Sequence, residues 1–361
     1  MLYLIDDVGA HGGAERFVRA LAEHAPCERI EPWVCSTRAV APGVVAELEA
    51  AGVRHLGLAR TAPWQAHRFA PLAALIRRER IDVLHAHKFG SNVWGTLLGR
   101  AARVPVVLAH EHNWSYSGGR VRRLIDGRLI APLATLFLTV SEASRARMIE
   151  LEGIAPAKVL ALPTAYIPSR RTGTDIRGEL GLDAQAKLIV VAAALRPEKA
   201  LEVLIEAHAQ LDRTAHLAIA GEGPCRAQLE RHTGTLGSSA RVHFLGWRED
   251  IDAILAGADA GVICSDWEGM PLFALECMAA GVPLVASAVG GTPELVRDGE
   301  SALLVPPRDP QALAGALARV LGDRELYGRL ADAARASDYG IERVAARFAD
   351  LYEQLARGAH R

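Results

Sequence analysis

The sequence contains few cysteines, and their spacing supports neither a disulfide framework nor a zinc site. The cysteines are odd in number and scattered, and no two of them form a Cys-x-x-Cys pair. Free thiols persist in a reducing cytosol, so the cysteine content predicts a cytoplasmic protein. The five positions are Cys27, Cys35, Cys225, Cys264 and Cys277.

Long apolar runs are also missing. No run approaches the ~18 residues that a helix needs to cross a bilayer. The chain opens on a short apolar segment, residues 2–5, followed at once by Asp6 and Asp7, which is too short and too acidic for a signal peptide. We therefore expect a cytoplasmic protein, either free in solution or peripheral on the inner face of the membrane.

A strong net charge is absent as well. The formal charge of −1 at pH 7 argues against nucleic acid as the main partner. The balance is uneven, because residues 1–165 carry 20 Lys/Arg and 15 Asp/Glu (+5), whereas residues 166–361 carry 21 and 27 (−6). Since 361 residues are many for a single core, the opposite charges of the two halves favour two domains.

Apolar strand patterns alternate with helical patterns in both halves, which predicts an α/β fold of two doubly wound, Rossmann-like domains. Such sheets bind ligands at the carboxyl ends of their strands. Residues 163–174 lack apolar periodicity and are expected to be a linker, while a last helix over 341–355 fits either half. The expected strands are 2–5, 32–35, 53–56, 83–86, 104–109 and 136–140, then 188–192, 216–220, 242–245, 261–263, 284–286 and 302–305.

Residues 265–283 carry the clearest functional pattern. They follow a short apolar run, 260–264, and lead through Gly269 and Pro271 into a helical pattern. Proline suits the first turn of a helix, where free amides and the positive end of the helix dipole favour an anion. Glu268 stands at the rim of this turn and Glu276 about two helical turns further on. Two acids beside an anion site indicate recognition of hydroxyl groups, as on sugars.

Three loops after expected strands could contact phosphates or a base, and each has a plain structural alternative. Gly12 and Gly13 open the first helix and either approach a phosphate or form a tight turn. Arg196 and Lys199 either neutralise a diphosphate leaving group without a metal or form a solvated charged loop. A third loop bends sharply and either lies beneath a planar base or has no ligand; its glycines are Gly221 and Gly223.

Four histidines lie at strand ends. His85 and His87 end one strand and His110 and His112 another, each pair on one face of the sheet. Imidazoles so placed can hold a metal, but such sites normally add carboxylates, and the only one near, Glu111, points to the other face. We therefore expect no metal site here, and contact with substrate or with neighbouring loops remains open.

The pair Asp250 and Asp252 matches the Asp-x-Asp pattern of metal-using transferases, a spacing that is common by chance. Because an Asp before a helical segment caps it well, we interpret the pair as structural.

A basic and aromatic segment follows the strand that ends near His112. Its composition suits an anionic membrane surface or a lipid-phosphate acceptor, and a solvated loop is the alternative. The residues are Trp114, Tyr116, Gly118, Gly119, Arg120, Arg122, Arg123 and Arg128.

Together these motifs resemble glycosyltransferase family 4, whose members are retaining sugar-nucleotide transferases of the two-domain B-type fold. The resemblance spans nearly the whole chain and is most specific over residues 256–320. Glu268 and Glu276 match the family's pair of glutamates separated by seven residues, and residues 280–287, 290–294, 12–15, 111–112 and 140–142 match further segments. The resemblance implies an acceptor-binding domain over 1–165, a donor-binding domain over 166–339, and a helix over 340–361 that packs back on the first.

The resemblance also implies roles for single residues. Glu276 would bind the ribose hydroxyls, Glu268 the donor sugar, and Lys199 the diphosphate. His112 would approach the donor sugar, and Gly13 lies on the loop that closes over the phosphates when the domains close. The phosphates would meet the backbone of Gly269, Met270, Pro271, Leu272 and Phe273.

Two departures from the family pattern are visible. The family usually has an arginine five residues before the lysine, where this chain has Ala194, so Arg196 is the nearest replacement. In addition, Thr164-Ala165 stands where Asn-Gly is common, which concerns the hinge more than the chemistry.

The expected function is that of a retaining, metal-independent glycosyltransferase of the hexosyltransferase type. It would need no cofactor and would move a sugar from a UDP- or GDP-linked donor to a hydroxyl of a saccharide or lipid-linked acceptor, in cell-surface polysaccharide or glycolipid synthesis. We expect Glu268, His112, Lys199 and Arg196 to be catalytic. The alternatives are a sugar-nucleotide epimerase on a similar fold and a catalytically silent nucleotide-sugar-binding subunit.

Overall fold

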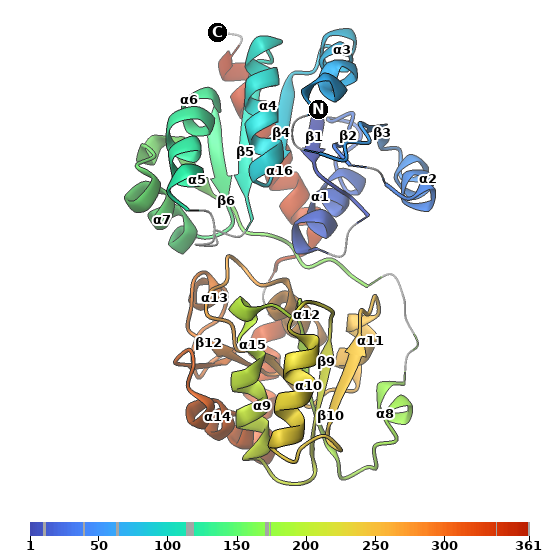
Figure 1. Ribbon diagram of the computed structural model, residues 1–361, viewed down its shortest axis with the longest axis vertical. Helices are drawn as coiled ribbons and strands as arrows, with labels where there is room; N and C mark the ends of the chain where they lie inside the picture. The colour runs from blue at the N-terminus through green and yellow to red at the C-terminus, as the bar shows by residue number, and fades with distance from the viewer. Residues whose placement is uncertain are drawn as a thin grey trace. The chain divides into compact units, whose positions relative to one another are not determined.

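The computed structural model describes residues 1–9, 12–38, 40–62, 65–112, 119–169, 173, 175–336 and 338–359. The chain forms two compact units (Figure 1). Unit 1 comprises Met1–Ile167 and Tyr339–Arg361, and unit 2 comprises Pro168–Asp338. Each unit contains one parallel sheet with helices on both faces, so the expected α/β class with two doubly wound sheets is confirmed.

In the described part of unit 1, seven parallel strands run in the order β3-β2-β1-β4-β5-β6-β7. They are β1 (Leu2–Ile5), β2 (Trp33–Ser36), β3 (Arg54–Gly57), β4 (Val83–His87), β5 (Val106–Glu111), β6 (Leu136–Thr139) and β7 (Val159–Ala161). The helices are α1 (Gly13–Glu23), α2 (Pro42–Ala50), α3 (Ala70–Arg78), α4 (Phe89–Ala101), α5 (Arg120–Ile125), α6 (Ala131–Leu133), α7 (Glu142–Glu152) and α16 (Ile341–Ala359), with shorter turns η1 (Ala66–Phe69), η2 (Asp126–Ile130) and η3 (Pro156–Lys158).

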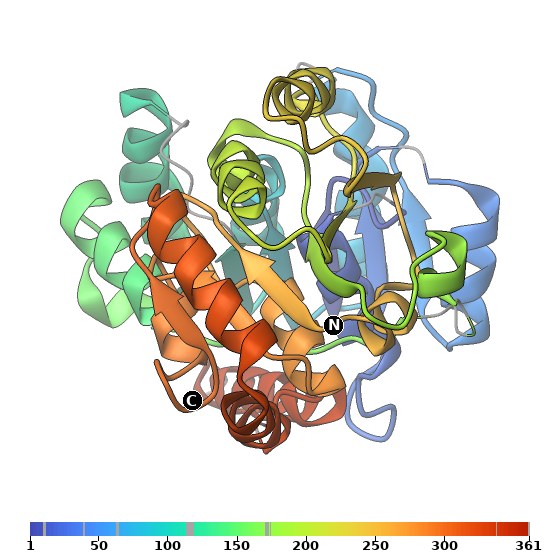
Figure 2. The same ribbon diagram turned by 90° about the horizontal axis from the view of Figure 1, so that it is seen from below.

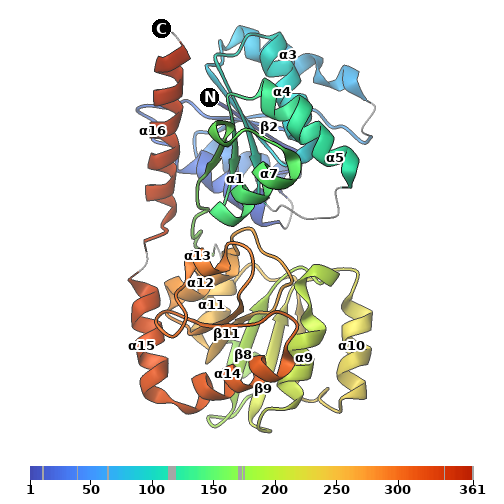
Figure 3. The ribbon, with the colours of Figure 1, turned by 90° about the vertical axis from the view of Figure 1, so that its left-hand side faces the viewer.

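The sheet of unit 1 is buried on both faces, as its nearly continuous apolar strands predict. Helices α1, α2 and α16 supply the apolar side chains on one face. Helices α3 and α4 cover the other. Helix α16 is separated in sequence from the rest of unit 1 by the whole of unit 2, yet it runs along unit 1 (Figure 3) and contributes Phe348 and Tyr352 to the core.

Unit 2 has six strands in its described residues, in the order β10-β9-β8-β11-β12-β13. They are β8 (Lys187–Ala192), β9 (Ala215–Ala220), β10 (Val242–Gly246), β11 (Ala260–Ile263), β12 (Leu284–Ser287) and β13 (Leu303–Val305). The helices are α8 (Ile176–Glu179), η4 (Pro197–Lys199), α9 (Leu201–Ala209), α10 (Arg226–Thr235), α11 (Ile251–Ala256), α12 (Leu272–Ala280), α13 (Thr292–Leu295), α14 (Pro310–Gly322) and α15 (Arg324–Arg335). Helices α9, α10 and α14 pack together on one face of this sheet, and α11, α12 and α15 on the other (Figure 2).

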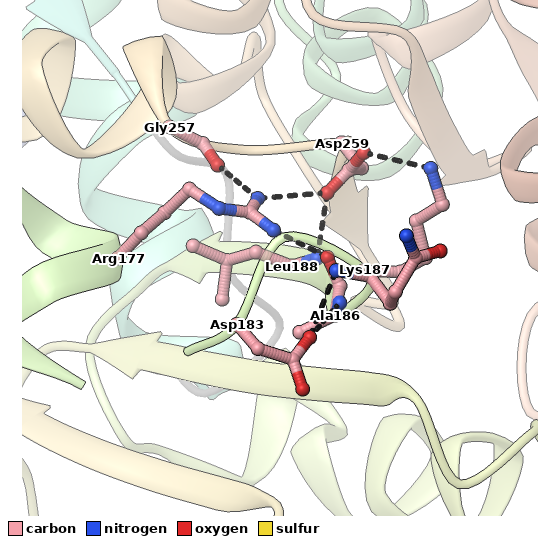
Figure 4. A network of polar contacts seen from close by, with 8 residues as sticks. Arg177, Asp183, Ala186, Lys187, Leu188, Gly257 and Asp259 are labelled. Carbon is pink, nitrogen blue, oxygen red and sulfur yellow. Dashed lines mark hydrogen bonds and ion pairs between the residues drawn. The ribbon is translucent and has the colours of Figure 1, made fainter. Parts of the chain in front are cut away.

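A polar network fixes the amino end of the β8 strand (Figure 4). The Arg177 guanidinium donates to the carbonyl oxygen of Gly257 at 3.0 Å and to the Asp259 carboxylate at 3.1 Å. The same carboxylate accepts from the Leu188 backbone N–H at 2.8 Å and from Lys187 at 3.4 Å. These charges satisfy one another within unit 2 and lie at the start of β8, so we assign them a structural role.

The structure moves several boundaries that the sequence predicted. Strand β5 was expected at 104–109 and lies at Val106–Glu111, so His110 is inside the strand and His112 follows it. Strand β7 was not predicted, because its three residues are too few to show a period. Asp250 precedes α11, but its side chain does not cap the helix and instead pairs with Arg248 at 2.7 Å.

Each sheet has a point at which the strand order reverses. In unit 1 it lies between β1 and β4, and in unit 2 between β8 and β11. At such a point the loops that leave the two strands diverge to opposite faces and leave a crevice at the carboxyl edge, where doubly wound proteins bind their ligands. The loops after these four strands therefore mark where a functional site is expected.

Candidate functional site

The loops at both reversal points contain residues that the sequence singled out. In unit 1, Gly12 and Gly13 follow β1, and His87 ends β4. In unit 2, Lys199 follows β8 and Glu268 follows β11. The folding pattern of each unit thus gathers these candidates at the carboxyl edge of its own sheet.

The Glu268 carboxylate forms the most constrained polar cluster of unit 2. Its Oε1 accepts a hydrogen bond from Lys199 Nζ at 2.6 Å and another from Ser265 Oγ at 2.5 Å. The residue is only 6% exposed. Within the described residues, Oε2 of Glu268 has no hydrogen-bond partner. Both anchoring bonds thus reach the same oxygen, which leaves the second oxygen available to a ligand.

A pair of glycines holds the backbone of Glu268. Gly291 donates its N–H to the Glu268 carbonyl oxygen at 3.1 Å. Gly290 has a φ of +53°, and a Cβ at this position would overlap the same carbonyl. Only glycine allows both the left-handed conformation and the close approach. The Gly290-Gly291 turn after β12 therefore fixes the loop that presents Glu268.

Helix α12 begins at Leu272, with Pro271 as the extended residue before its first turn, so the helix starts one residue later than the sequence suggested. Its first amides have no partner within the helix, and its positive end faces the same loop as Glu268. Glu276 lies in α12 and is 3% exposed. Of the other residues that the sequence singled out in this stretch, Gly269 and Phe273 are buried, and Met270 and Leu272 are partly exposed.

The glycines of the loop after β9 have a packing role. A Cβ on Gly221 would overlap the carbonyl oxygen of Ala193, and one on Gly223 would overlap that of Leu195. The carbonyl oxygen of Glu222, in the same loop, accepts a hydrogen bond from the Leu195 N–H at 3.0 Å. These glycines thus let two loops lie in contact and shape the segment that leads to Lys199. In the same segment Arg196 is exposed.

In unit 1 the glycine turn after β1 is tied to the end of β4. Gly12 precedes α1, and a Cβ there would overlap the Glu15 carboxylate. That carboxylate, 6% exposed, accepts from Lys88 Nζ at 2.5 Å. Lys88 itself has a φ of +69°, a strained conformation for a residue with a side chain. The ion pair therefore joins the turn at Gly12 and Gly13 to the strand end that carries His87.

The four histidines of β4 and β5 form one cluster. His85 and His87 have ring centroids 4.0 Å apart, and those of His110 and His112 are 4.2 Å apart. His87 Nδ1 lies 2.9 Å from His112 Nε2, and His110 Nδ1 lies 3.2 Å from His85 Nε2. Burial lowers the pKa of all four, that of His112 to about 3 with a contribution from Lys88. The cluster is therefore uncharged near neutral pH.

The geometry of the cluster fits hydrogen bonding better than metal binding. One nitrogen each of His85, His87 and His110 lies within 4.8 Å of the others. However, both ring nitrogens of His85 are already in use, since Nδ1 lies 2.8 Å from the Tyr352 hydroxyl and Nε2 lies 3.2 Å from His110 Nδ1. Holding an ion would break these bonds.

Glu111 lies apart from the histidines, as the alternation along a strand predicts. It forms an ion pair with Arg122, whose Nε is 3.5 Å from Asp126. Burial, followed by the charge of Glu152, raises the pKa of Asp126 to about 8. Arg122 is thus an internal partner of carboxylates and not part of an exposed basic surface.

The basic segment after β5 is described only in part, since Trp114, Tyr116 and Gly118 lie outside the described residues. In its described part, Val121 is 71% exposed and Leu124 is 52% exposed on α5. Gly119, Arg120 and Arg128 are also exposed, and Arg123 is partly exposed. Across the described chain, no helix is both long and apolar enough to cross a membrane.

Sequence reasoning missed several contributors. Ser265 was inside the central stretch without a role, although its place three residues before Glu268 could have suggested a contact. Lys88, 73 positions from Glu15, gave no local signal. Arg308 is a further case, because it reaches back across the sequence to Asp266 beside the Glu268 loop, with Nε 2.7 Å from Oδ1.

Comparisons with known proteins bear on the family and the fold of the chain. Residues 11–170 match the family described as Glycosyltransferase Family 4, and residues 173–337 match Glycosyl transferases group 1. The D-inositol 3-phosphate glycosyltransferase of Corynebacterium glutamicum (strain R) is 30% identical over 312 residues, which cover 78% of this chain and 74% of that protein. The alpha-D-kanosaminyltransferase of Streptomyces kanamyceticus is 28% identical over 310 residues, covering 78% and 79%.

A solved structure gives the same architecture. The crystal structure of Anabaena Alr3699/HepE in complex with UDP and glucose superposes with a TM-score of 0.84 and covers 98% of this chain and 99% of that one. At 23% identity, this likeness bears on the fold alone.

Proposed function

Because the chain belongs to glycosyltransferase family 4 and is a glycosyltransferase, we propose that it transfers a sugar from a UDP- or GDP-linked donor to a hydroxyl acceptor with retention of configuration and without a metal. The donor binds at the carboxyl edge of the unit 2 sheet, and unit 1 binds the acceptor. The acceptor is a saccharide or a lipid-linked saccharide used in cell-surface polysaccharide or glycolipid synthesis.

The observation that carries the proposal is the buried carboxylate of Glu268 in contact with Lys199, 2.6 Å away, beside the start of α12. When the sugar leaves, negative charge develops on the diphosphate. The Lys199 ammonium and the free amides of α12 stabilise that charge, and the exposed Arg196 adds a second cation. These cations do the work that a magnesium ion performs in other transferases, so the transfer proceeds without metal.

The two glutamates bind different parts of the donor. Glu268 Oε2 accepts a hydrogen bond from a hydroxyl of the donor sugar. Glu276, four residues into α12, binds the ribose hydroxyls. Following the family's pattern, we assign the donor phosphates as the ligand of the glycine turn at Gly12 and Gly13, and the donor sugar as the ligand of His112. Retention of configuration is carried over from the family, because no single residue of this chain specifies it.

The first experiment is a thermal-shift screen with a panel of UDP- and GDP-sugars, since a ligand that binds the folded state raises its stability. The stabilising donor is then incubated with hydroxyl acceptors, and the anomeric configuration of the product is read by NMR. We expect transfer with retention that persists in EDTA. Glu268→Ala should reduce turnover about 100-fold or more, whereas Glu300→Ala, an exposed carboxylate of the same unit, should not.

Other outcomes overturn the proposal in recognisable ways. Isomerisation of the donor without acceptor identifies an epimerase, and donor binding without turnover identifies a silent binding subunit. Wild-type turnover by Glu268→Ala removes the proposed site, and loss of activity in EDTA that returns with a divalent cation removes the metal-free mechanism.

We also propose that α5 docks the protein on an anionic membrane surface. Val121 and Leu124 are exposed beside Arg120, and apolar side chains flanked by cations favour the interface of an anionic bilayer. Because Arg122 is engaged with Glu111, the charges that face solvent are those of Arg120, Arg123 and Arg128.

Sedimentation with vesicles of anionic and of neutral lipid tests this docking. Arg120→Ser with Arg123→Ser should weaken binding to anionic vesicles by roughly 1 kcal/mol per charge, about fivefold each. The matched control, Arg319→Ser with Arg324→Ser in unit 2, should bind as the wild type does. Unchanged partitioning of the α5 variant refutes the proposal.

A further inference from the structure

The four histidines of unit 1 are joined into two parallel hydrogen-bonded chains. The shorter chain links His87 Nδ1 to His112 Nε2 at 2.9 Å. The longer chain links His110 Nδ1 to His85 Nε2 at 3.2 Å and His85 Nδ1 to the Tyr352 hydroxyl at 2.8 Å. Among the described residues, each chain ends on a buried nitrogen without a partner, Nε2 of His87 in one and Nε2 of His110 in the other.

The charge state of the cluster limits where its protons lie. Burial lowers the pKa of each histidine, so each ring is neutral and carries a single N–H. In the pair of His87 and His112, one ring must therefore donate and the other must accept. Which of the two rings donates decides whether the single proton of His112 lies on Nδ1 or on Nε2.

Nε2 of His87, which has no partner among the described residues, decides which ring of the pair donates the hydrogen bond. If His112 donated, the single proton of His87 would lie on Nε2 as a buried N–H without an acceptor. If His87 donates from Nδ1, its Nε2 keeps only a bare lone pair. Buried donors left without an acceptor are the rarer defect in folded proteins. His87 therefore donates to His112 Nε2, and the proton of His112 lies on Nδ1.

The same argument gives the longer chain the same direction. His110 Nε2 is buried without a partner among the described residues, so a bare lone pair there places the proton of His110 on Nδ1. His110 Nδ1 then donates to His85 Nε2, and His85 Nδ1 donates to the Tyr352 hydroxyl. The chain again ends on a bare lone pair, at His110 Nε2.

We propose that His87 is a positioning residue for His112: its Nδ1–H bond fixes the ring and the tautomer of His112, so that His112 presents Nδ1–H as a neutral hydrogen-bond donor to an oxygen of the donor sugar. The choice of the sugar as ligand rests on the proposed function. His112 thus acts by donating a hydrogen bond and not as a general base.

The surroundings of His112 suit this role. His87 is fully buried, whereas His112 follows β5 and is partly exposed, so it is the member of the pair that a ligand can reach. The ring of Phe17 packs edge-on against His112 with centroids 5.6 Å apart. Phe17 limits the tilt of the ring but cannot select its tautomer. Among the described residues, the bond from His87 does both.

The test compares substitutions that keep or remove the bond. Because the Asn side-chain amide occupies the place of an imidazole Nδ1–H, His87→Asn retains a donor to His112, whereas His87→Leu removes it. For folded protein we expect His87→Leu to lower kcat by about 10- to 100-fold with little change in the donor KM, as loss of an orienting partner does elsewhere. His87→Asn should recover most of kcat.

His85→Leu is the matched control. His85 is equally buried and its ring lies 4.0 Å from that of His87, but it has no hydrogen bond to His112. A purely structural role predicts equal damage from both leucine variants. Our proposal predicts that His85→Leu lowers the melting temperature while its kcat stays near that of the wild type.

NMR of the protein labelled with ¹⁵N-histidine reads the tautomer without any substrate. We expect His112 of the wild type to be in the Nδ1–H form and a mixture of forms in His87→Leu. An Nε2–H form in the wild type overturns the proposal, as does equal loss of kcat in His87→Asn and His87→Leu. Because the NMR result needs no turnover, it stands or falls separately from the proposed transfer reaction.

Discussion

At the scale of single residues, the candidate site depends on which oxygen of the Glu268 carboxylate accepts each hydrogen bond. Lys199 and Ser265 both bond Oε1 of Glu268. In the proposed function, these two bonds orient the carboxylate and leave Oε2 to the donor sugar. Ser265 then acts by orienting Glu268, and its hydroxyl takes no part in the chemistry.

Because the Ser265 bond helps to orient the carboxylate of Glu268, the effect of Ser265→Ala can be predicted. A hydrogen bond to a charged group contributes about 1.5–3 kcal/mol, and part of that orients Glu268 for the transition state. We expect kcat to fall about tenfold, equivalent to ~1.4 kcal/mol, with the fold retained in circular dichroism. Ser301→Ala, at an exposed turn of the same unit, is the control. Full turnover by Ser265→Ala would show that Lys199 alone holds the carboxylate.

Residue types were the part of the site that the sequence could predict. Glu268, Glu276 and Lys199 were named from their motifs and from the strands that precede them. Their mutual contacts were not predictable, because these depend on rotamers and on loops that meet only after folding. The pairing of Lys88 with Glu15 and that of Tyr352 with His85, 267 positions apart, left no local pattern.

At the scale of elements, short turns after strands position the functional groups. The existence and the approximate boundaries of most strands followed from apolar runs, since parallel strands are buried on both faces. The turns gave weaker signals, because a glycine packed against a backbone carbonyl and a glycine in open space look the same in a sequence. Gly290 and Gly299, both with a positive φ (+53° and +73°), illustrate this.

The two glycines therefore form a matched pair for a test. Alanine at either position has to adopt a left-handed conformation, which costs roughly 1–2 kcal/mol. At Gly299 a Cβ meets nothing within 4 Å, whereas at Gly290 it would overlap the carbonyl of Glu268. We expect both alanine variants to lose stability but only Gly290→Ala to lose most of its turnover, measured per folded molecule. Equal turnover in the two variants would contradict the role of the Gly290 turn.

At the scale of the whole molecule, the buried histidines make stability depend on pH. The pKa of His85, His87 and His110 lies well below the unfolded value of 6.5, so below that pH the unfolded chain binds protons that the folded chain does not. Each contributes a loss of about 1.4 kcal/mol per pH unit. Asp126 acts in the opposite sense, since its pKa is raised to about 8, but it is one group against four, because the pKa of His112 is lowered as well.

In unit 2, burial lowers the pKa of His208 to about 4, which is one strongly shifted group against four in unit 1. We therefore expect unit 1 to lose more stability than unit 2 between pH 7 and pH 5. Hydrogen exchange monitored by mass spectrometry resolves the two units in one sample. Amides of β4 and β5 should lose protection at pH 5, after correction for the intrinsic rate, before those of β8 and β11 do. Parallel loss in both units would indicate that the histidine cluster is more hydrated than its burial implies.

Helix α16 has a consequence for the order in which the protein matures on the ribosome. Domains generally fold as units during synthesis, and unit 2 has its full complement of residues once residue 338 has been made. Unit 1 was begun first but lacks Phe348 and Tyr352 until the final segment emerges. Unit 1 therefore completes its core only when α16 emerges, after unit 2 has been synthesised, and until then an apolar face of unit 1 is uncovered in the nascent chain.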